Sequence, residues 1–178
     1  MTRAGQTVPQ SDERSARFRD AMASFPSGVT LVTTSDERGR WWGFTASSFC
    51  SLSADPPLAL VCLAKSAQCH PVFRSASSWV VQVVPDHHAE LARRFATRGA
   101  DKFSHGAFRA GRDGHPVLED ACVVLECERF AAYEGGDHTI LVGEVSDCRI
   151  RDASPILYFQ RSFHSLEGGA RRVPEPSS

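Results

Sequence analysis

Small hydroxyl-bearing residues and a lysine are concentrated in one stretch of this sequence, where they could bind a phosphate group. The segment Thr45-Ala46-Ser47-Ser48 comes first, and Lys65-Ser66 follows an apolar run at residues 58–63. Backbone N–H groups of small residues can approach an anion closely, hydroxyls add donors, and a lysine offsets the charge. Two polar loops that flank one buried strand can meet at the end of that strand. The sequence therefore predicts a phosphate-binding cradle, against the alternatives of a serine-rich surface turn and a solvated lysine.

A histidine directly follows a glycine-rich hairpin signal, Gly135-Gly136-Asp137. The glycines supply the positive φ that a tight hairpin turn requires. His138 is then expected at the end of a loop, where binding residues are often found. Its ring can donate a hydrogen bond to a substrate carbonyl, so we interpret it as a candidate catalytic residue. The alternative is an ordinary surface histidine.

Two further segments combine aromatic rings with cations, at residues 95–103 and 158–163. A guanidinium group can clamp a phosphate bidentately or stack on a ring. For the first segment the alternative is core packing around an exposed Asp-Lys ion pair, which contributes little to stability. For the second segment the alternative is a terminal strand that docks by its aromatic rings. The aromatic and cationic residues in question are Phe95, Lys102 and Phe103 in the first segment and Tyr158 and Arg161 in the second.

Nucleophilic and metal-dependent chemistry receive little support from the sequence. It contains no G-x-S-x-G elbow, no G-x-G-x-x-G fingerprint and no C-x-x-C pair, so a dinucleotide would have to bind without the Rossmann arrangement. The pair His87-His88 does not repeat at i+4 and is interpreted as solvated, and we predict no metal site. In a reducing compartment the six cysteines are expected to be small buried hydrophobic residues. They are Cys50, Cys62, Cys69, Cys122, Cys127 and Cys148.

The overall composition indicates one globular domain. The chain has 178 residues, of which 42% are hydrophobic and 23% are charged, enough for a sizeable core. A formal net charge of −1 leaves no basic excess for a phosphate backbone, so no nucleic acid partner is expected. No apolar run approaches the roughly 18 residues of a membrane span, and residues 1–14 lack the apolar core of a secretory signal. A cytoplasmic location without membrane contact is therefore predicted.

The hydrophobic pattern predicts a mainly β fold with a few helices. A first helix begins at Ser11 or Asp12 and carries an apolar face of Phe18, Met22 and Phe25. A later helix begins at Asp86 and runs to about residue 98. Many short strands without regular βαβ alternation favour a closed or nearly closed barrel. The predicted strands are residues 29–34, 41–44, 58–63, 79–84, 123–128 and 139–145, within a folded body of residues 12–166 flanked by disordered tails at 1–11 and 167–178.

Eight segments in this order resemble the short-chain flavin reductases, the flavin reductase-like family whose fold is a Greek-key, FMN-binding split β-barrel. The resemblance covers about residues 17–166, nearly the whole folded body. Within the family it points to the reductase components of two-component aromatic monooxygenases of the actinorhodin type. The segments are residues 25–29, 43–49, 55–58, 62–66, 101–103, 114–118, 136–138 and 158–163.

The resemblance places the candidate residues around a bound flavin. It implies one loop against the isoalloxazine ring and the ribityl phosphate, a second wall in which Lys65 faces the phosphate, a group that closes the pocket, and a nicotinamide side. At the position of Ser47 the family often has asparagine, so a hydroxyl would replace a side-chain amide there. In the order just given, the groups are Thr45-Ala46-Ser47-Ser48, then Cys62, Lys65 and Ser66, then Phe95 and Lys102 with Phe103 beside them, and finally His138, Tyr158 and Arg161.

The reaction that the resemblance implies is hydride transfer from NADH or NADPH to FMN or FAD. The cofactors carry this chemistry and the protein supplies position, with His138 orienting the nicotinamide or assisting a proton step. The family also implies a homodimer, and a partner flavin-dependent monooxygenase that receives diffusible reduced flavin. Two alternatives stay open: a split-barrel flavin- or haem-binding protein without reductase turnover, and an enzyme that keeps its flavin and oxidises an organic substrate. For the 2′-phosphate of NADPH the candidate cations are Arg74, Arg94 and Arg98.

Overall fold

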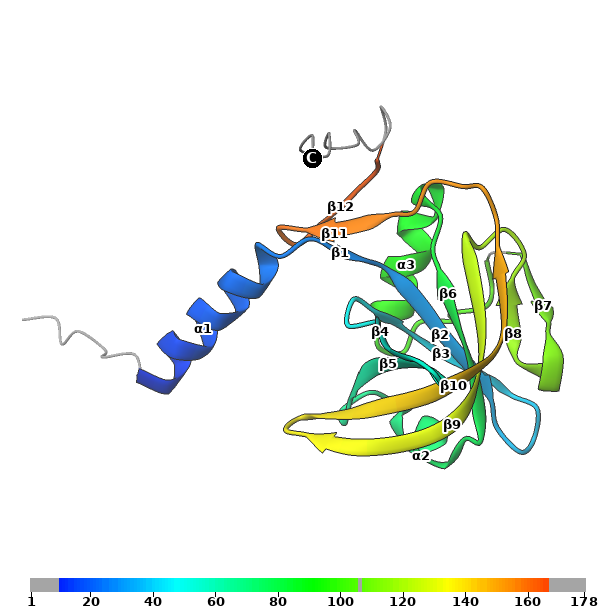
Figure 1. The fold of residues 1–178 in the computed structure, drawn as a ribbon. Helices are drawn as coiled ribbons and strands as arrows, with labels where there is room; N and C mark the ends of the chain where they lie inside the picture. The colour runs from blue at the N-terminus through cyan, green and yellow to red at the C-terminus, as the bar shows by residue number, and fades with distance from the viewer. Residues whose placement is uncertain (1–9, 106, 167–178) are drawn as a thin grey trace, which may run out of the picture.

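The structure is a computed structural model that describes residues 10–105 and 107–166. Strands are its main secondary structure, and three helices and two 3-10 turns accompany them (Figure 1). The helices are α1 (Gln10–Ala23), α2 (His70–Ser75) and α3 (Ala89–Ala96), and the 3-10 turns are η1 (Asp86–His88) and η2 (Arg112–Gly114). The strands are β1 (Ser27–Gly28), β2 (Thr30–Ser35), β3 (Trp41–Ala46), β4 (Cys50–Ala54), β5 (Pro57–Ala64), β6 (Ser78–Val83), β7 (Phe108–Ala110), β8 (Pro116–Leu118), β9 (Val123–Gly135), β10 (His138–Ile150), β11 (Leu157–Phe159) and β12 (Ser162–His164).

Seven of these strands form one antiparallel sheet in the order β3-β2-β6-β9-β10-β5-β4. Within the described residues the edge strands β3 and β4 do not pair with each other, but the sheet curls until β3 approaches β5. Residues 47–49 carry the chain from one edge to the other. The predicted mainly β fold is confirmed, and the expected barrel is split rather than closed because the edge strands β3 and β4 do not pair.

Apolar side chains cover both faces of this sheet. Leu31 and Val32 are neighbours on β2 and therefore point to opposite faces, and both are fully buried. Leu31 belongs to one hydrophobic cluster with Phe95 of α3, and Val32 belongs to another with Phe73 of α2. In β5 the apolar run at residues 58–63 is buried at Leu58, Ala59, Val61 and Leu63, while Leu60 and Cys62 on the other face are only partly buried.

A buried glutamine joins three strands in the interior. Gln82 on β6 is 0% exposed. Its Oε1 accepts the N–H of Leu118 at 2.5 Å, while its Nε2 donates to Thr33 Oγ1 at 2.9 Å and to Pro116 O at 3.2 Å. Strands β2, β6 and β8 are thereby linked by side-chain hydrogen bonds at a place where an unpaired polar group would be costly.

Replacing Gln82 with methionine, which has a similar shape, should destabilise the protein by about 2–3 kcal/mol, because the N–H of Leu118 would lose its acceptor inside the core. Chemical denaturation measures the difference in free energy of unfolding. Gln160→Met, at an exposed glutamine, is the control and should change stability by less than about 0.5 kcal/mol. A Gln82→Met protein as stable as the wild type would show that the network makes no net contribution.

Helix α1 extends away from the sheet (Figure 1). The apolar residues Phe18 and Met22 on α1, and Phe25 just after it, are 64%, 53% and 70% exposed. The predicted apolar face therefore exists but does not pack on the core of the same chain. The helix is tied instead to the β11–β12 hairpin, where Gln160 N donates to Ala23 O at 2.8 Å.

Several elements begin or end away from their predicted positions. Helix α1 begins at Gln10, just before the expected cap at Ser11 or Asp12, a difference within the usual variation of helix ends. The turn η1 occupies the expected start of the later helix, so Asp86 does not cap α3, whose N-cap is His88. Helix α2 is not predicted from the sequence, because its six residues are too few to show a helical hydrophobic periodicity.

The prediction that all six cysteines are buried was wrong for three of them. All are free thiols, and Cys69, Cys122 and Cys127 are buried. Cys50 and Cys148 are exposed because one begins the edge strand β4 and the other lies in the exposed outer half of β10. Cys62 has intermediate exposure.

The tails expected at residues 1–11 and 167–178 lie outside the described residues, apart from Gln10 and Ser11 in α1. Among the residues that the structure describes, no helix combines the length and the apolar character needed to cross a bilayer.

Candidate functional site

Two adjacent hollows contain most of the predicted site residues. The first, of about 320 Å³, lies at the ends of β3 and β5, beside the segment that follows α3. The second, of about 490 Å³, lies between β3, α3 and the β11–β12 hairpin. Thr45, Ala96 and Thr97 line both hollows. Of the predicted residues, the first is lined by Thr45, Cys62, Ser66, Phe95, Lys102 and His138, and the second by Thr45, Ser47, Tyr158 and Arg161.

The hydroxyl-rich loop after β3 meets the end of β5, as predicted. The N–H of Cys62 donates to Ser48 Oγ at 3.0 Å, and this hydroxyl lies 3.4 Å from Cys62 O. Ala46 is buried in the core. Ser48 and Ala46 therefore position the loop, while Thr45 and Ser47 line the hollows.

Helix α3 is fixed over the end of β3. Thr45 Oγ1 donates to Ala92 O at 2.6 Å. A Cβ atom at Gly43 would lie 2.7 Å from Phe95 Cε1, so this position on β3 must be glycine for the ring to pack there. Phe95 is 1% exposed, and it serves both the core and the wall of the first hollow.

Two cations line the first hollow, Lys102 and Arg98. Lys102 Nζ donates to the carbonyl of Phe95 and lies 5.7 Å from the centre of the Phe95 ring. Burial lowers the pKa of the Lys102 ammonium group below its usual value. Both cations can bind a phosphate. The sequence suggests Arg98 only as a cation for the 2′-phosphate of NADPH, because nothing in its spacing indicates that it lies beside Lys102.

Lys65 has other partners. Its Nζ lies 2.6 Å from Glu134 Oε2 and donates to Gly136 O at 2.7 Å. The hydrogen bond from Lys65 holds the pKa of the Glu134 carboxyl below its usual value. A phosphate near Ser66, which lines the first hollow, would have to compete with Glu134 for this ammonium group.

His138 is the first residue of β10, where it pairs with Ala64 of β5, and it lines the first hollow. Its Nδ1 lies 2.8 Å from Asp137 Oδ1, and this hydrogen bond lowers the pKa of Asp137. A histidine that donates through Nδ1 to a carboxylate keeps Nε2 for a ligand. Gly136 has a φ of 67°, so the predicted glycine-dependent hairpin turn is confirmed.

Three predicted residues also make structural contacts. Phe103 packs edge-on against Phe95, with ring centres 5.1 Å apart. Tyr158 packs against the hydrophobic cluster beside α3. Arg161, in the left-handed region with a φ of 61°, forms an ion pair with Asp20 of α1. The β11–β12 hairpin therefore both lines the second hollow and anchors α1.

A larger hollow of about 920 Å³ lies elsewhere, beside the β2–β3 turn and α2, and includes His115 in its lining. His115 is 7% exposed, its Nδ1 lies 2.8 Å from Ser35 Oγ, and its Nε2 lies 2.8 Å from Ser78 Oγ. Burial lowers the pKa of His115, and hydrogen bonds engage both of its ring nitrogens. Size alone does not identify the site, because the aromatic wall and the two cations belong to the smaller hollow.

Comparison with known sequences supports a flavin-related site. Residues 22–167 match the family described as "Flavin reductase like domain". The chain is 46% identical over 158 residues to actinorhodin polyketide dimerase of Streptomyces coelicolor, covering 88% of this chain and 89% of that protein. It is 41% identical over 151 residues to the NADH:riboflavin 5′-phosphate oxidoreductase of Streptomyces pristinaespiralis, covering 83% of this chain and 86% of that protein.

A solved structure shares the fold at the level of the whole chain. The NADH:FAD oxidoreductase of Streptomyces globisporus C-1027, in complex with NAD and FAD fragments, has a TM-score of 0.82 and 31% sequence identity with this chain. The match covers 96% of this chain and 100% of that one. Together with the curled seven-stranded sheet, this similarity confirms the predicted split-barrel fold.

Proposed function

The chain belongs to the flavin reductase-like domain family, and on this basis we propose that it is an NAD(P)H:flavin oxidoreductase. It reduces FMN or FAD by hydride transfer and releases diffusible reduced flavin to a partner flavin-dependent monooxygenase. The observation that carries the proposal is the first hollow, where hydroxyl donors, an aromatic wall, two cations and one histidine converge. Relatives whose names specify NADH favour that dinucleotide over NADPH.

The residues around the two hollows fit a flavin nucleotide. The volumes of about 320 and 490 Å³ lie in the range of roughly 300–1,000 Å³ that is usual for small-molecule sites. Ser66 offers a hydroxyl and Phe95 an apolar ring edge to a planar ligand, while the Thr45 hydroxyl holds Ala92. Arg98 and Lys102 offer the positive charge that a flavin phosphate requires.

The protein's part in the reaction is to position two rings. When both are bound, the flavin and the nicotinamide supply the hydride transfer. Phe95, held by Gly43 and by the core, gives one ring a rigid wall. His138, oriented by Asp137, would hold the nicotinamide carboxamide through Nε2. Fixing the two reactants in contact removes much of the entropic barrier, which agrees with the lack of a nucleophile motif in the sequence.

The function is tested by NADH oxidation with purified protein, with and without added FMN or FAD. Oxidation that depends on added flavin supports the reductase. A protein that binds flavin and oxidises neither NADH nor NADPH would instead be a carrier or sensor. An enzyme that keeps its flavin would turn over an organic substrate without a second protein and without added flavin.

A homodimer is part of the proposal, with a second copy covering α1. The support is the exposed apolar face of Phe18, Met22 and Phe25 on a helix that extends away from its own sheet (Figure 1). Such a face on a soluble chain usually marks an interaction surface. We also propose a cytoplasmic location and a folded body of residues 12–166. The family match over residues 22–167 supports these bounds of the folded body.

The double substitution Phe18→Ser, Phe25→Ser should convert the dimer to a monomer, because it removes two large apolar side chains from the proposed contact. Sedimentation equilibrium of both proteins measures the change in mass. Glu13→Ser, on the opposite side of α1, is the matched control and should remain dimeric. A wild-type protein that sediments as a monomer, or a double variant that stays dimeric, would contradict this part of the proposal.

A further inference from the structure

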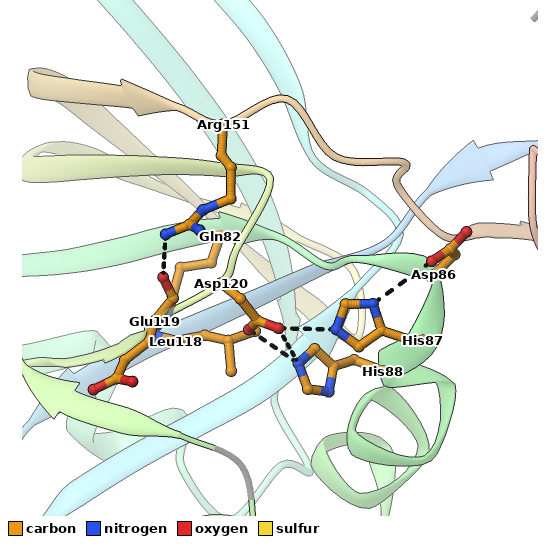
Figure 2. A network of polar contacts seen from close by, with 8 residues as sticks. All are labelled: Gln82, Asp86, His87, His88, Leu118, Glu119, Asp120 and Arg151. Carbon is orange, nitrogen blue, oxygen red and sulfur yellow. Dashed lines mark hydrogen bonds and ion pairs between the residues drawn. The ribbon is translucent and has the colours of Figure 1, made fainter. Parts of the chain in front are cut away.

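Two adjacent histidines and a distant aspartate converge at the start of α3. Figure 2 shows the rings of His87 and His88 directed toward the carboxylate of Asp120. Nε2 of His87 lies 2.8 Å from Asp120 Oδ2, and Nε2 of His88 lies 3.0 and 2.9 Å from Oδ1 and Oδ2. The histidines belong to η1, whereas Asp120 lies in the turn between β8 and β9. The sequence could not reveal this cluster because 32 residues separate His88 from Asp120.

The spacing of these atoms suits a single small cation. The ligand atoms of the three residues all lie within 4.8 Å of one another. Zinc binds imidazole nitrogen and carboxylate oxygen at about 2.0–2.2 Å in tetrahedral geometry, which places neighbouring ligand atoms roughly 3.4 Å apart. The separations of 2.8 and 2.9 Å between the imidazole nitrogens and Asp120 Oδ2 would therefore need to widen by about half an ångström to admit the ion. Imidazole and carboxylate together suit zinc and its first-row neighbours, whereas calcium and magnesium prefer all-oxygen sites.

The turn that carries Asp120 is held on both sides. The N–H of Leu118 is bound by the buried Gln82, and Arg151 donates to Glu119 O at 2.9 Å (Figure 2). The N–H of Cys122 donates to Val83 O at 3.0 Å. The carboxylate is therefore fixed before any ion arrives, which lowers the entropic cost of binding.

The histidine side is fixed as well. The N–H of Asp86 donates to Ser154 O at 3.0 Å, and the N–H of His88 donates to Pro85 O at 3.0 Å. Asp86 Oδ1 lies 3.7 Å from Nδ1 of His87, and Asp86 Oδ2 accepts Ser165 Oγ at 2.7 Å. The distance of 3.7 Å is an ion-pair distance and not a hydrogen bond, so Asp86 would have to move closer to become the outer partner that zinc-bound histidines usually have.

We propose that His87, His88 and Asp120 bind one divalent transition-metal ion of the zinc class. The ion takes the place of the Nε2 protons that join the two imidazoles to the carboxylate, each ring then carries its one proton on Nδ1, and water completes the coordination. By binding ligands from both segments, the ion links the start of α3 to the β8–β9 turn. The site lies at the opposite end of α3 from Phe95, which lines the first hollow, so the ion serves the scaffold and not the hydride transfer.

The test is a zinc titration of tag-free protein that has been stripped with EDTA, read by competition with a chromogenic chelator. We expect one equivalent of Zn²⁺ to bind to the wild type. His87→Gln, His88→Gln should abolish this binding, and so should Asp120→Asn. Asp86→Asn, which alters only the outer partner, should weaken it by about tenfold. His105→Gln, at a histidine outside the cluster, is the control and should bind as the wild type does.

Two readings would overturn the proposal. One is a wild type that takes up no zinc in this competition, and the other is uptake that persists undiminished in Asp120→Asn, which would assign the ion to exposed thiols such as Cys50 and Cys148. Flavin-dependent NADH oxidation at the wild-type rate verifies that each variant is folded. Because the ion binds the folded state, zinc should also raise the melting temperature of the wild type and of His105→Gln. It should leave the melting temperature of Asp120→Asn unchanged.

Discussion

Replacing His138 with alanine is expected to slow NADH-dependent flavin reduction by about 100-fold, the lower end of the range for a positioned acid–base or orienting group. Flavin affinity should change little, because the phosphate and ring contacts lie on other residues. His138 lines the first hollow and is held by Asp137 through Nδ1. Rapid mixing of protein and flavin with saturating NADH measures the reduction rate, and a flavin titration measures the affinity.

The matched control is His105→Ala, at an exposed histidine that bonds its neighbour Ser104, and it should reduce flavin at the wild-type rate. Asp137→Asn should give an intermediate rate, because it keeps the His138 ring and removes the carboxylate that fixes its orientation. An unchanged rate for His138→Ala at saturating NADH would remove His138 from the mechanism.

Replacing Lys102 with alanine is expected to weaken FMN binding by about 10- to 100-fold. A hydrogen bond to a charged group contributes about 1.5–3 kcal/mol, and each 1.4 kcal/mol is roughly a factor of ten in affinity. Lys102 is one of two cations that line the first hollow, and its pKa is lowered by burial, which indicates a desolvated ammonium group. Riboflavin, which lacks the phosphate, should lose much less affinity than FMN.

The chain offers a matched control in Lys65, its only other lysine. The family resemblance implies that Lys65 faces the flavin phosphate. In the structure, however, the Lys65 ammonium group forms an ion pair with Glu134 and donates a hydrogen bond to Gly136 O. Lys65→Ala should therefore weaken FMN binding less than Lys102→Ala does, and Arg98→Ala should resemble the latter. Equal losses of affinity for FMN and riboflavin in Lys102→Ala would show that Lys102 does not contact the phosphate. A larger loss of FMN affinity in Lys65→Ala than in Lys102→Ala would show that Lys65 is the lysine that binds the phosphate.

The parts of the site that sequence could predict are those set by local chemistry. The loop of Thr45 and Ser48 was expected to meet the end of the following buried strand, and antiparallel pairing of β4 with β5 brings it there. The turn before His138 was predicted from two glycines, and Gly136 adopts the positive φ that such a turn needs. In both cases a few consecutive residues determine the geometry.

The remaining features depend on contacts between distant segments. Which lysine lines the hollow is decided by Glu134, 69 positions away from Lys65 in the sequence, and no spacing reveals this. The apolar pattern of α1 predicts a helix but not that the helix leaves its own core. The pair His87-His88 has no i+4 partner in the sequence, which favours a solvated pair, and Asp120 joins it only through the tertiary fold.

The release of reduced flavin as a diffusible product is tested most directly by the anaerobic reduction of FMN in large molar excess by NADH, with a catalytic amount of the protein. We expect the visible absorbance of oxidised flavin to be lost completely, with one NADH consumed per flavin and many flavins reduced by each protein molecule. Reduction that stops at one flavin per protein molecule would contradict this expectation, because the flavin would then be a retained cofactor and not a diffusible product.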